Sequence, residues 1–409
     1  MMANLNPIAF VVPAFLVFLG IELYVARRKR RPELFNYESS VSNISVGIAE
    51  RMLNLLITGS FYTLYYFVFE HYALFTISNA WWVWVLLLFV TDFVWYWYHR
   101  LGHEVNLFWG AHIVHHQSEE FNFTVSARIT TLQAVLRNVF WIILPFIGFH
   151  PAMVLTILIL HGGYPFFVHT QLIGKLGWIE YVLVTPSHHG VHHASNEKYL
   201  DKNYGNIFIF WDMLFGTFQR EEEKPVYGLT HPLKSKSFLW QHFHFYAELV
   251  EACRRTSGLK NWVGIIFGRP EKMDASVRPY LEGRLFAERV SFDTTFRFKA
   301  YLNIQLVICF LLVFGFTIFY DQLPVPDSTF IVAFTLVTLV NCGALMEQRR
   351  WVFNLEAGRL LMVLGYISYV EAGMVFFLIS VFVVMVIASL DSMRQGYFRF
   401  LFQEGDIAL

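Results

Sequence analysis

The sequence predicts an all-α, polytopic helical membrane protein with a cytoplasmic, histidine-rich catalytic cap for two metal ions. Of the 409 residues, 56% are hydrophobic and 15% are charged, and the mean hydropathy is +0.45. This composition is too apolar for an ordinary soluble protein. Apolar runs recur along the chain, and most are long enough to cross the ~30 Å of hydrocarbon in a bilayer. The third observation is that 12 of the 16 histidines lie between positions 99 and 193.

The first apolar run, residues 8–26, is followed directly by five basic residues at 27–31 (RRKRR). Neither a charged segment nor a small-residue cleavage site precedes this basic block, so we expect a retained anchor rather than a secretory signal. The positive-inside rule places the block in the cytoplasm. Runs at about 50–70 and 80–98 then cross the membrane twice, which returns the chain to the cytoplasm at His99.

Residues 135–169 predict a helical hairpin that is broken near Gly148, His150 and Pro151 and that ends on the cytoplasmic side at His169. A polar region follows to about 298. The chain is expected to re-enter lipid at about 300–320 and 328–345, and again at about 359–390 as two helices that meet near Glu371 and Gly373. These boundaries predict an N-terminal anchor and basic loop (1–44), a catalytic domain (45–298) and a C-terminal transmembrane module (299–409).

Nine of the histidines form four groups that predict a metal centre. Residues three and four apart share a helix face, so each group is expected to point its imidazoles one way. Each neutral imidazole offers one nitrogen to a metal, and nine ligands are too many for one ion. Two metals are therefore implied. The predicted ligands are His99 and His103; His112, His115 and His116; His169; and His189, His192 and His193.

Other histidines are expected to play lesser parts. His161 and His188 lie near the groups, and we expect them to support ligands rather than to bind metal. The remaining isolated histidines, such as His71 and His150, are expected to be ordinary hydrogen-bonded polar residues.

The ligand type favours iron. An all-nitrogen set suits iron, copper or zinc, whereas magnesium and calcium prefer oxygen. A pair of irons can share the electrons that activate dioxygen, and apolar surroundings suit attack on an unactivated C–H bond. The three cysteines, Cys253, Cys309 and Cys342, form no spaced pair, so neither a disulfide framework nor a cysteine metal clip is expected. The net charge of zero gives no reason to expect a nucleic-acid partner.

Several polar residues are candidates for supporting the ligands. Asp92 precedes His99 by seven residues on the same helix face, inside an apolar run where an ionisable group is costly, and we expect it to accept the second N–H of a ligand. Glu104 directly follows His103. Together with Asn122, these two are the candidate catalytic residues. Other residues that can orient imidazoles are Glu119, Arg128, Asp201, Asn203 and Asp212.

The order of the histidine groups resembles the fatty acid hydroxylase / sterol desaturase superfamily of membrane di-iron enzymes. The likeness covers roughly residues 45–270. Beyond the histidines, it is carried by 98–106 (YHRLGHEVN), 115–122 (HHQSEEFN), 185–193 (TPSHHGVHH), 201–204 (DKNY), 211–218 (WDMLFGTF) and 227–232 (YGLTHP).

The resemblance implies a monooxygenase that hydroxylates a lipid C–H bond with dioxygen, and Glu104 matches a glutamate associated with activity in the superfamily. The chain is most similar to members that cleave the ether bond of alkylglycerols with tetrahydrobiopterin as reductant. Relatives that hydroxylate or desaturate sterols or fatty acyl chains draw electrons from cytochrome b5 or a ferredoxin-type donor. The expected partners are a lipid substrate, dioxygen, membrane lipids and an electron donor.

Two other functions fit parts of the pattern. A metal transporter would place its ligands in the middle of crossing helices, whereas these histidines are predicted at helix ends. A zinc-dependent membrane hydrolase would bring a motif such as His-Glu-x2-His, and His103-Glu104 lacks the second histidine at that spacing.

Overall fold

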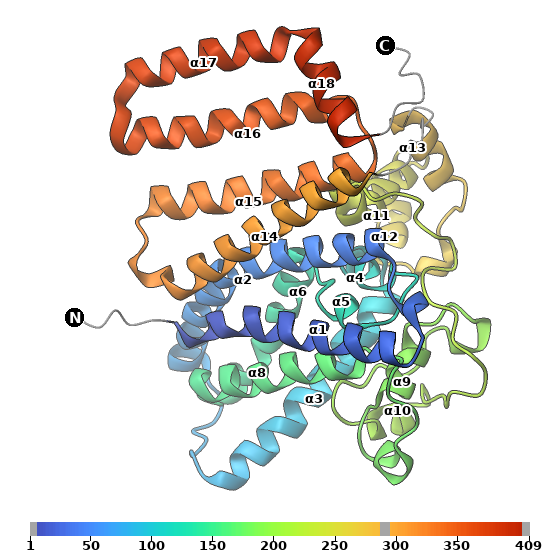
Figure 1. The fold of residues 1–409 in the computed structure, drawn as a ribbon. Coiled ribbons are helices and arrows are strands. Elements are labelled where there is room, and N and C mark those ends of the chain that lie inside the picture. Colours follow the sequence, from blue (N-terminus) through green and yellow to red (C-terminus); the bar gives the residue numbers. More distant parts are fainter. Residues whose placement is uncertain (1–5, 287–294, 403–409) are drawn as a thin grey trace. The chain divides into compact units, whose positions relative to one another are not determined.

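The computed structural model describes residues 6–286 and 295–402, and all the regular structure in these residues is helical apart from two isolated β-bridges (Figure 1). The expected all-α class is confirmed. Residues 1–5, 287–294 and 403–409, which belong to the expected anchor, polar region and C-terminal module, lie outside the described residues. The chain forms two compact units: residues 14–234 with 242–281, here the histidine unit, and residues 1–13, 235–241 and 282–409, here the C-terminal unit.

The histidine unit combines long apolar helices with short ones that carry the polar groups. Its longer helices are α1 (Val11–Arg28, which begins in the other unit), α2 (Tyr37–Tyr72), α3 (Trp81–Glu104), α4 (Asn106–His116), α6 (Thr131–Trp141) and α8 (Pro151–Val168). Its shorter helices are α5 (Phe123–Ser126), α7 (Ile143–Ile147), α9 (Pro186–His192), α10 (Phe210–Phe215) and α12 (Leu259–Ile266). Two helices continue into the C-terminal unit, α11 (Phe238–Arg254) and α13 (Val277–Leu285).

Seven helical segments of the described residues are long and apolar enough to cross a membrane. Four lie wholly or mostly in the histidine unit and correspond to α1, α2, α3 and α8. The first limb of the predicted hairpin is shorter than a span, because it breaks into α6 and α7. Gly148 ends α7 with a φ of +123°, and a Cβ there would lie 2.0 Å from the carbonyl oxygen of Phe75, so this turn requires glycine.

An apolar core joins three of the membrane helices of the histidine unit, α2, α3 and α8, to α6 and α7. Tyr65 of α2, Leu87 of α3, Trp141 of α6 and Ile157 of α8 belong to one buried cluster. The Tyr65 hydroxyl donates to the carbonyl oxygen of Asn138 at 2.8 Å, which satisfies its polar tip inside the core. These contacts pack the N-terminal halves of α3 and α8 together, and both helices carry ligands at their C-terminal ends.

The basic block lies against the segment that follows His169. Lys29 Nζ donates to the Leu172 carbonyl at 3.1 Å, and Arg31 Nη1 donates to the Gln171 carbonyl at 3.3 Å. The block that ends the first apolar helix and the histidine that follows α8 are therefore at the same end of the bundle.

The C-terminal unit contains the other candidate membrane segments, and α16 and α17 form a hairpin (Figure 1). The hairpin turns at a π-helix, Ser368–Ala372, followed by Gly373 with a φ of +74°, where two helices were expected to meet. Inside this unit, Glu356 pairs with Arg359 at 2.7 Å and accepts a hydrogen bond from Tyr301. Its helices are α14 (Phe296–Ile318), α15 (Val325–Met346), α16 (Val352–Ile367), α17 (Gly373–Ser389) and α18 (Asp391–Leu401).

Candidate metal centre

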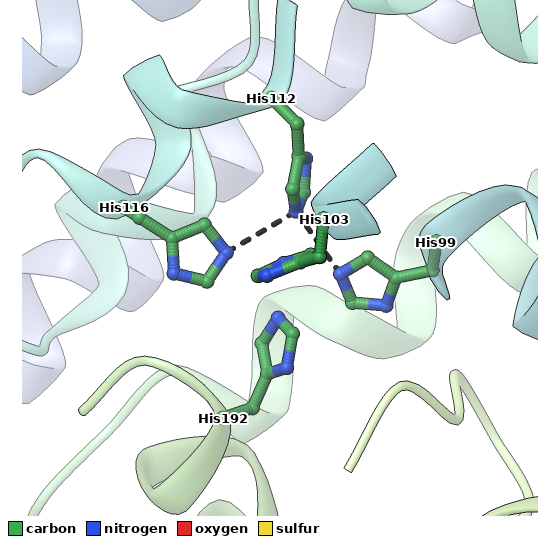
Figure 2. A group of neighbouring side chains, drawn as sticks. All are labelled: His99, His103, His112, His116 and His192. Carbon is green, nitrogen blue, oxygen red and sulfur yellow. Dashed lines mark hydrogen bonds between the residues drawn. The ribbon is translucent and has the colours of Figure 1, made fainter. Parts of the chain in front are cut away.

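The nine predicted ligands converge in the histidine unit and divide into two clusters. Within each cluster, one ring nitrogen from every histidine lies within 4.8 Å of all the others. Figure 2 shows the imidazoles of the first cluster pointing toward one another. The first cluster is His99, His103, His112, His116 and His192, and the second is His115, His169, His189 and His193.

Each His-x2-His-His motif contributes to both clusters, which corrects the expectation that each group points one way. On α4, His112 and His116 belong to the first cluster and His115 to the second. At α9 the assignment is reversed, since His189 and His193 belong to the second cluster and His192 to the first. The i,i+4 pair of each motif thus shares a cluster, while the histidine between them faces the other one. The two clusters are consequently adjacent, and both depend on the same two helices, α4 and α9.

Backbone carbonyls determine which ring nitrogen of several ligands carries the proton. His99 Nδ1 lies 2.8 Å from the Tyr204 carbonyl oxygen, and His192 Nδ1 lies 2.8 Å from that of Lys202. In the second cluster, His115 and His169 place Nδ1 at 3.2 and 2.6 Å from carbonyl oxygens. A carbonyl oxygen can only accept, so Nδ1 is the donor in these neutral rings and Nε2 has a free lone pair.

These lone pairs face one another in a way that a cation would stabilise. The Nε2 atoms of His115 and His169 are 3.2 Å apart, although both rings already use their proton at Nδ1. In the first cluster, Nε2 of His103 and Nε2 of His192 are buried without a partner among the described residues. Buried polar atoms normally have a partner, and convergent imidazole lone pairs are the donor set that transition metals bind. The residues therefore fit two metal ions.

Burial keeps the imidazoles in the form that binds metal. Burial lowers the pKa of these histidines well below the usual value, and its effect is larger than that of the neighbouring histidines. It lowers the pKa of His169 to about 4. An imidazole with a depressed pKa is neutral at pH 7 and does not need to lose a proton before it binds a cation. Outside the membrane-spanning helices, the other ligands with such a lowered pKa are His112, His115, His116, His189, His192 and His193.

Aromatic rings cover the outer sides of both clusters. Phe121 is buried, with its ring centroid 5.2 Å from that of His193, and it stacks on Tyr227 at 4.9 Å. On the first cluster, the ring of Tyr204 lies 5.2 Å from that of His103 and 5.9 Å from that of His192. These ring contacts contribute to the burial of the imidazoles.

Two of the three candidate catalytic residues have different partners from those expected. Asp92 accepts from the backbone N–H groups of Ile207 and Phe208 at 3.0 and 3.1 Å, rather than from a ligand imidazole. Asn122 caps α5 by accepting from Thr124 N at 3.0 Å, and its Nδ2 donates to the Leu34 carbonyl. Both side chains are used to hold backbone segments.

Glu104, the third candidate, lies at the end of α3 between two arginines. Its carboxylate is 3.0 Å from Arg100 Nε and 3.4 Å from Arg269 Nη2. Among the residues that the structure describes, the carboxylate nearest to a ligand is instead that of Asp201, whose Oδ1 is 3.7 Å from His103 Nδ1.

His161 and His188 lie outside both clusters. His161 Nδ1 is 2.8 Å from Asn206 Nδ2, which donates to it, and 3.7 Å from an oxygen of Asp92. His188 forms a capping box with Thr185 at the start of α9.

Backbone groups supply much of the ligand orientation that was expected from side chains. Arg128 orients His115 through its carbonyl oxygen, while its guanidinium donates to Asn43 Oδ1 and the Val114 carbonyl. Every residue has a carbonyl, so the sequence gives no direct signal for such a role. Lys202 and Tyr204 are the exceptions, since both belong to the DKNY motif at 201–204.

Comparison with known proteins places the sequence among lipid-modifying oxygenases. The profile of the family "Fatty acid hydroxylase" matches residues 84–217. The chain is 32% identical to alkylglycerol monooxygenase of Homo sapiens over 86% of its own length and 80% of the relative. It is 30% identical to that of Xenopus tropicalis over 87% and 80%, and 28% identical to that of Danio rerio over 88% and 82%. No solved structure matches the chain.

Proposed function

Because the chain belongs to the fatty acid hydroxylase family and is related over most of its length to alkylglycerol monooxygenases, we propose that it is a di-iron monooxygenase that hydroxylates a lipid C–H bond. The observation that carries this proposal is the pair of buried clusters, one of five histidines and one of four, beside apolar helices. In the reaction, one atom of dioxygen enters the C–H bond and the other leaves as water, with two electrons from a reductant and two protons.

The proposed ligands hold the two irons, which would supply the redox chemistry that activates dioxygen. The protein orients the rings of His99, His115, His169 and His192 through carbonyl oxygens. Phe121 and Tyr204 keep water away from the imidazoles. A site without water favours oxidation of substrate over loss of the oxidising equivalents. Glu104 is proposed to act beside the ligands, at the end of α3.

The proposed substrate is an amphiphile whose tail enters from the membrane while its head group stays at the surface. Both clusters adjoin the ends of α3 and α8, so a C–H bond a short way down the tail is within reach. The named relatives act on alkylglycerols, and we propose the carbon next to the ether oxygen as the target. Its hydroxylation gives a hemiacetal, which breaks down to a fatty aldehyde and glycerol.

We place the active site on the cytoplasmic side and assign residues 45–298 as the catalytic domain. The support is the contact of the RRKRR block with the segment after His169, since such a block stays in the cytoplasm. Tetrahydrobiopterin is the proposed reductant, and cytochrome b5 or a ferredoxin-type protein is the alternative donor.

The experiment supplies purified protein with an alkylglycerol, ¹⁸O₂ and reduced tetrahydrobiopterin, and traps the aldehyde as its alcohol for mass spectrometry. We expect labelled product from the unmodified protein and no labelled product from the His112→Ala and His115→Ala controls. Oxidation of a sterol or fatty acyl chain but not of the ether lipid would reject the proposed substrate. If iron is present and no lipid is oxidised with any of the donors, the monooxygenase assignment is wrong, and metal uptake into vesicles would then favour a transporter.

A further inference from the structure

Two buried carboxylates outside the ligand set face the same short segment, residues 202–208. They are Asp92, in the middle of α3, and Asp212, in α10, and both have 0% exposed area. Burying a carboxylate is costly unless its oxygens accept hydrogen bonds. The partners of these two groups therefore indicate what each carboxylate is for.

Asp212 holds the beginning of the segment. Its Oδ1 accepts from Tyr204 N at 2.7 Å and its Oδ2 accepts from Gly205 N at 2.8 Å. The Thr217 hydroxyl donates to Oδ1 at 2.7 Å. A Cβ on Gly205 would lie 2.9 Å from Asp212 Oδ2 and 2.6 Å from the Phe208 carbonyl oxygen. The backbone is thus packed directly against this carboxylate.

Asp92 holds the end of the segment. Its two oxygens accept from the backbone N–H groups of Ile207 and Phe208 at 3.0 and 3.1 Å, and Oδ2 also accepts from Trp211 Nε1 at 3.0 Å. Between the two carboxylates, Asn206 Nδ2 donates to the His161 carbonyl at 3.1 Å. Four backbone N–H groups of five consecutive residues therefore donate to just two carboxylates.

The carbonyl oxygens of the same segment orient two ligands of the first cluster. Tyr204 O accepts from His99 Nδ1, and Lys202 O accepts from His192 Nδ1, each at 2.8 Å. Asn203, between them, has a φ of +56°, a conformation that a non-glycine residue keeps only when its surroundings impose it. The carbonyls that orient the second cluster belong to Arg128 and Pro165, which lie in other segments.

We propose that Asp92 and Asp212 are positioning residues for the first metal site, acting through the backbone of residues 202–208. Each carboxylate fixes N–H groups, the fixed backbone presents two carbonyls, and these carbonyls aim His99 and His192 at one ion. The proposal rests on the metal binding in the proposed function but not on its substrate. It requires the second cluster to be independent of both carboxylates.

The test is metal occupancy and spectroscopy of Asp92→Asn and Asp212→Asn in full-length protein loaded with ⁵⁷Fe(II). Asparagine keeps the shape but offers one acceptor oxygen and turns an NH₂ toward a backbone N–H, so the segment must move. We expect iron to fall from about two to about one per chain, with the Mössbauer signal of one site lost and that of the other unchanged. The matched control is Glu248→Gln, which neutralises a buried carboxylate paired with Arg278 at 2.6 Å, and it should keep both signals.

A smaller perturbation keeps the test valid if an asparagine variant does not fold. Gly205→Ala leaves both carboxylates in place but pushes on Asp212 Oδ2, and it should weaken the same iron signal selectively. Two irons with unchanged spectra in all three variants would overturn the positioning role, as would equal loss from both sites. If the unmodified protein bound no iron, the proposed function itself would fail, which is a distinguishable result.

Discussion

At the residue scale, neighbours in the sequence serve different metals. His192 and His193 are adjacent, yet the first belongs to the five-histidine cluster and the second to the four-histidine cluster. Helical geometry explains this division, because successive side chains rotate by about 100° and cannot share a face. The chemistry of each position follows from its cluster and not from its motif.

This division predicts distinct metal losses. His192→Ala should release the iron of the first cluster, and His193→Ala should release that of the second, because each removes an imidazole that faces only one group. Iron analysis with Mössbauer spectra of the two ⁵⁷Fe-loaded variants checks this. Loss of the same signal in both variants would contradict the assignment.

Glu104 provides a second prediction at this scale. Its carboxylate contacts Arg100 and Arg269, so Glu104→Gln should leave iron content intact while turnover falls by about tenfold or more, equivalent to ~1.4 kcal/mol in the barrier. Glu251→Gln is the matched control, because it removes a similar i,i+4 pair with Arg255 at 3.1 Å at the C-terminal end of α11. Iron loss in the Glu104 variant, or unchanged turnover, would refute the role proposed for this carboxylate.

At the element scale, short helices and the C-terminal ends of helices place the ligands. His169 immediately follows α8 and donates to the Pro165 carbonyl one turn earlier. A capping box between Thr185 and His188 starts α9, which supplies three ligands within two turns. The capping box satisfies backbone N–H groups at the start of α9 and so stabilises this short, ligand-bearing helix.

The turn between α7 and α8 gives a prediction for the element that delivers His169. Gly148→Ala should destabilise the protein by roughly 1–3 kcal/mol, since alanine is strained at a φ of +123° and its Cβ meets the Phe75 carbonyl. Gly162→Ala, within α8 and with nothing within 4 Å, should be neutral or slightly stabilising. Thermal unfolding in detergent compares the two variants, and equal midpoints would contradict the prediction.

At the scale of the whole molecule, both clusters belong to the histidine unit alone. The C-terminal unit has its own buried polar network around Glu356 and Arg359. Ionisable groups inside an apolar bundle are tolerated only when they are paired. This network therefore holds the helices of the C-terminal unit together through specific polar contacts.

Orientation in the membrane is the prediction at this scale. A cysteine introduced at Glu197, an exposed position just after the second cluster, should be protected from an impermeant thiol reagent in sealed cells and labelled after permeabilisation. Ser78→Cys, in the exposed loop between α2 and α3, should show the opposite pattern. Both variants are made with Cys253→Ser, because that native thiol is partly exposed. Labelling of position 197 from outside would reverse the proposed topology.

The sequence by itself determined the helical class, most of the apolar segments and the nine converging histidines. Apolar run length and histidine spacing are local properties, and a bilayer-spanning helix needs no distant partner to be recognised. The junction of two helices near Glu371 and Gly373 could be predicted for the same reason, because an ionisable residue and a glycine interrupt an apolar helix locally.

Only the tertiary structure decided how the nine histidines divide and what Asp92 does. On α4, His112 and His116 are about 40° apart around the helix axis and His115 lies about 60° from His112 on the other side, so the partners of each depend on which distant segments pack there. Asp92 shares a helix with His99, but its carboxylate accepts from backbone N–H groups of the loop before α10 and from the Trp211 indole of α10. Long-range packing makes these choices, and a pattern along one helix cannot encode them.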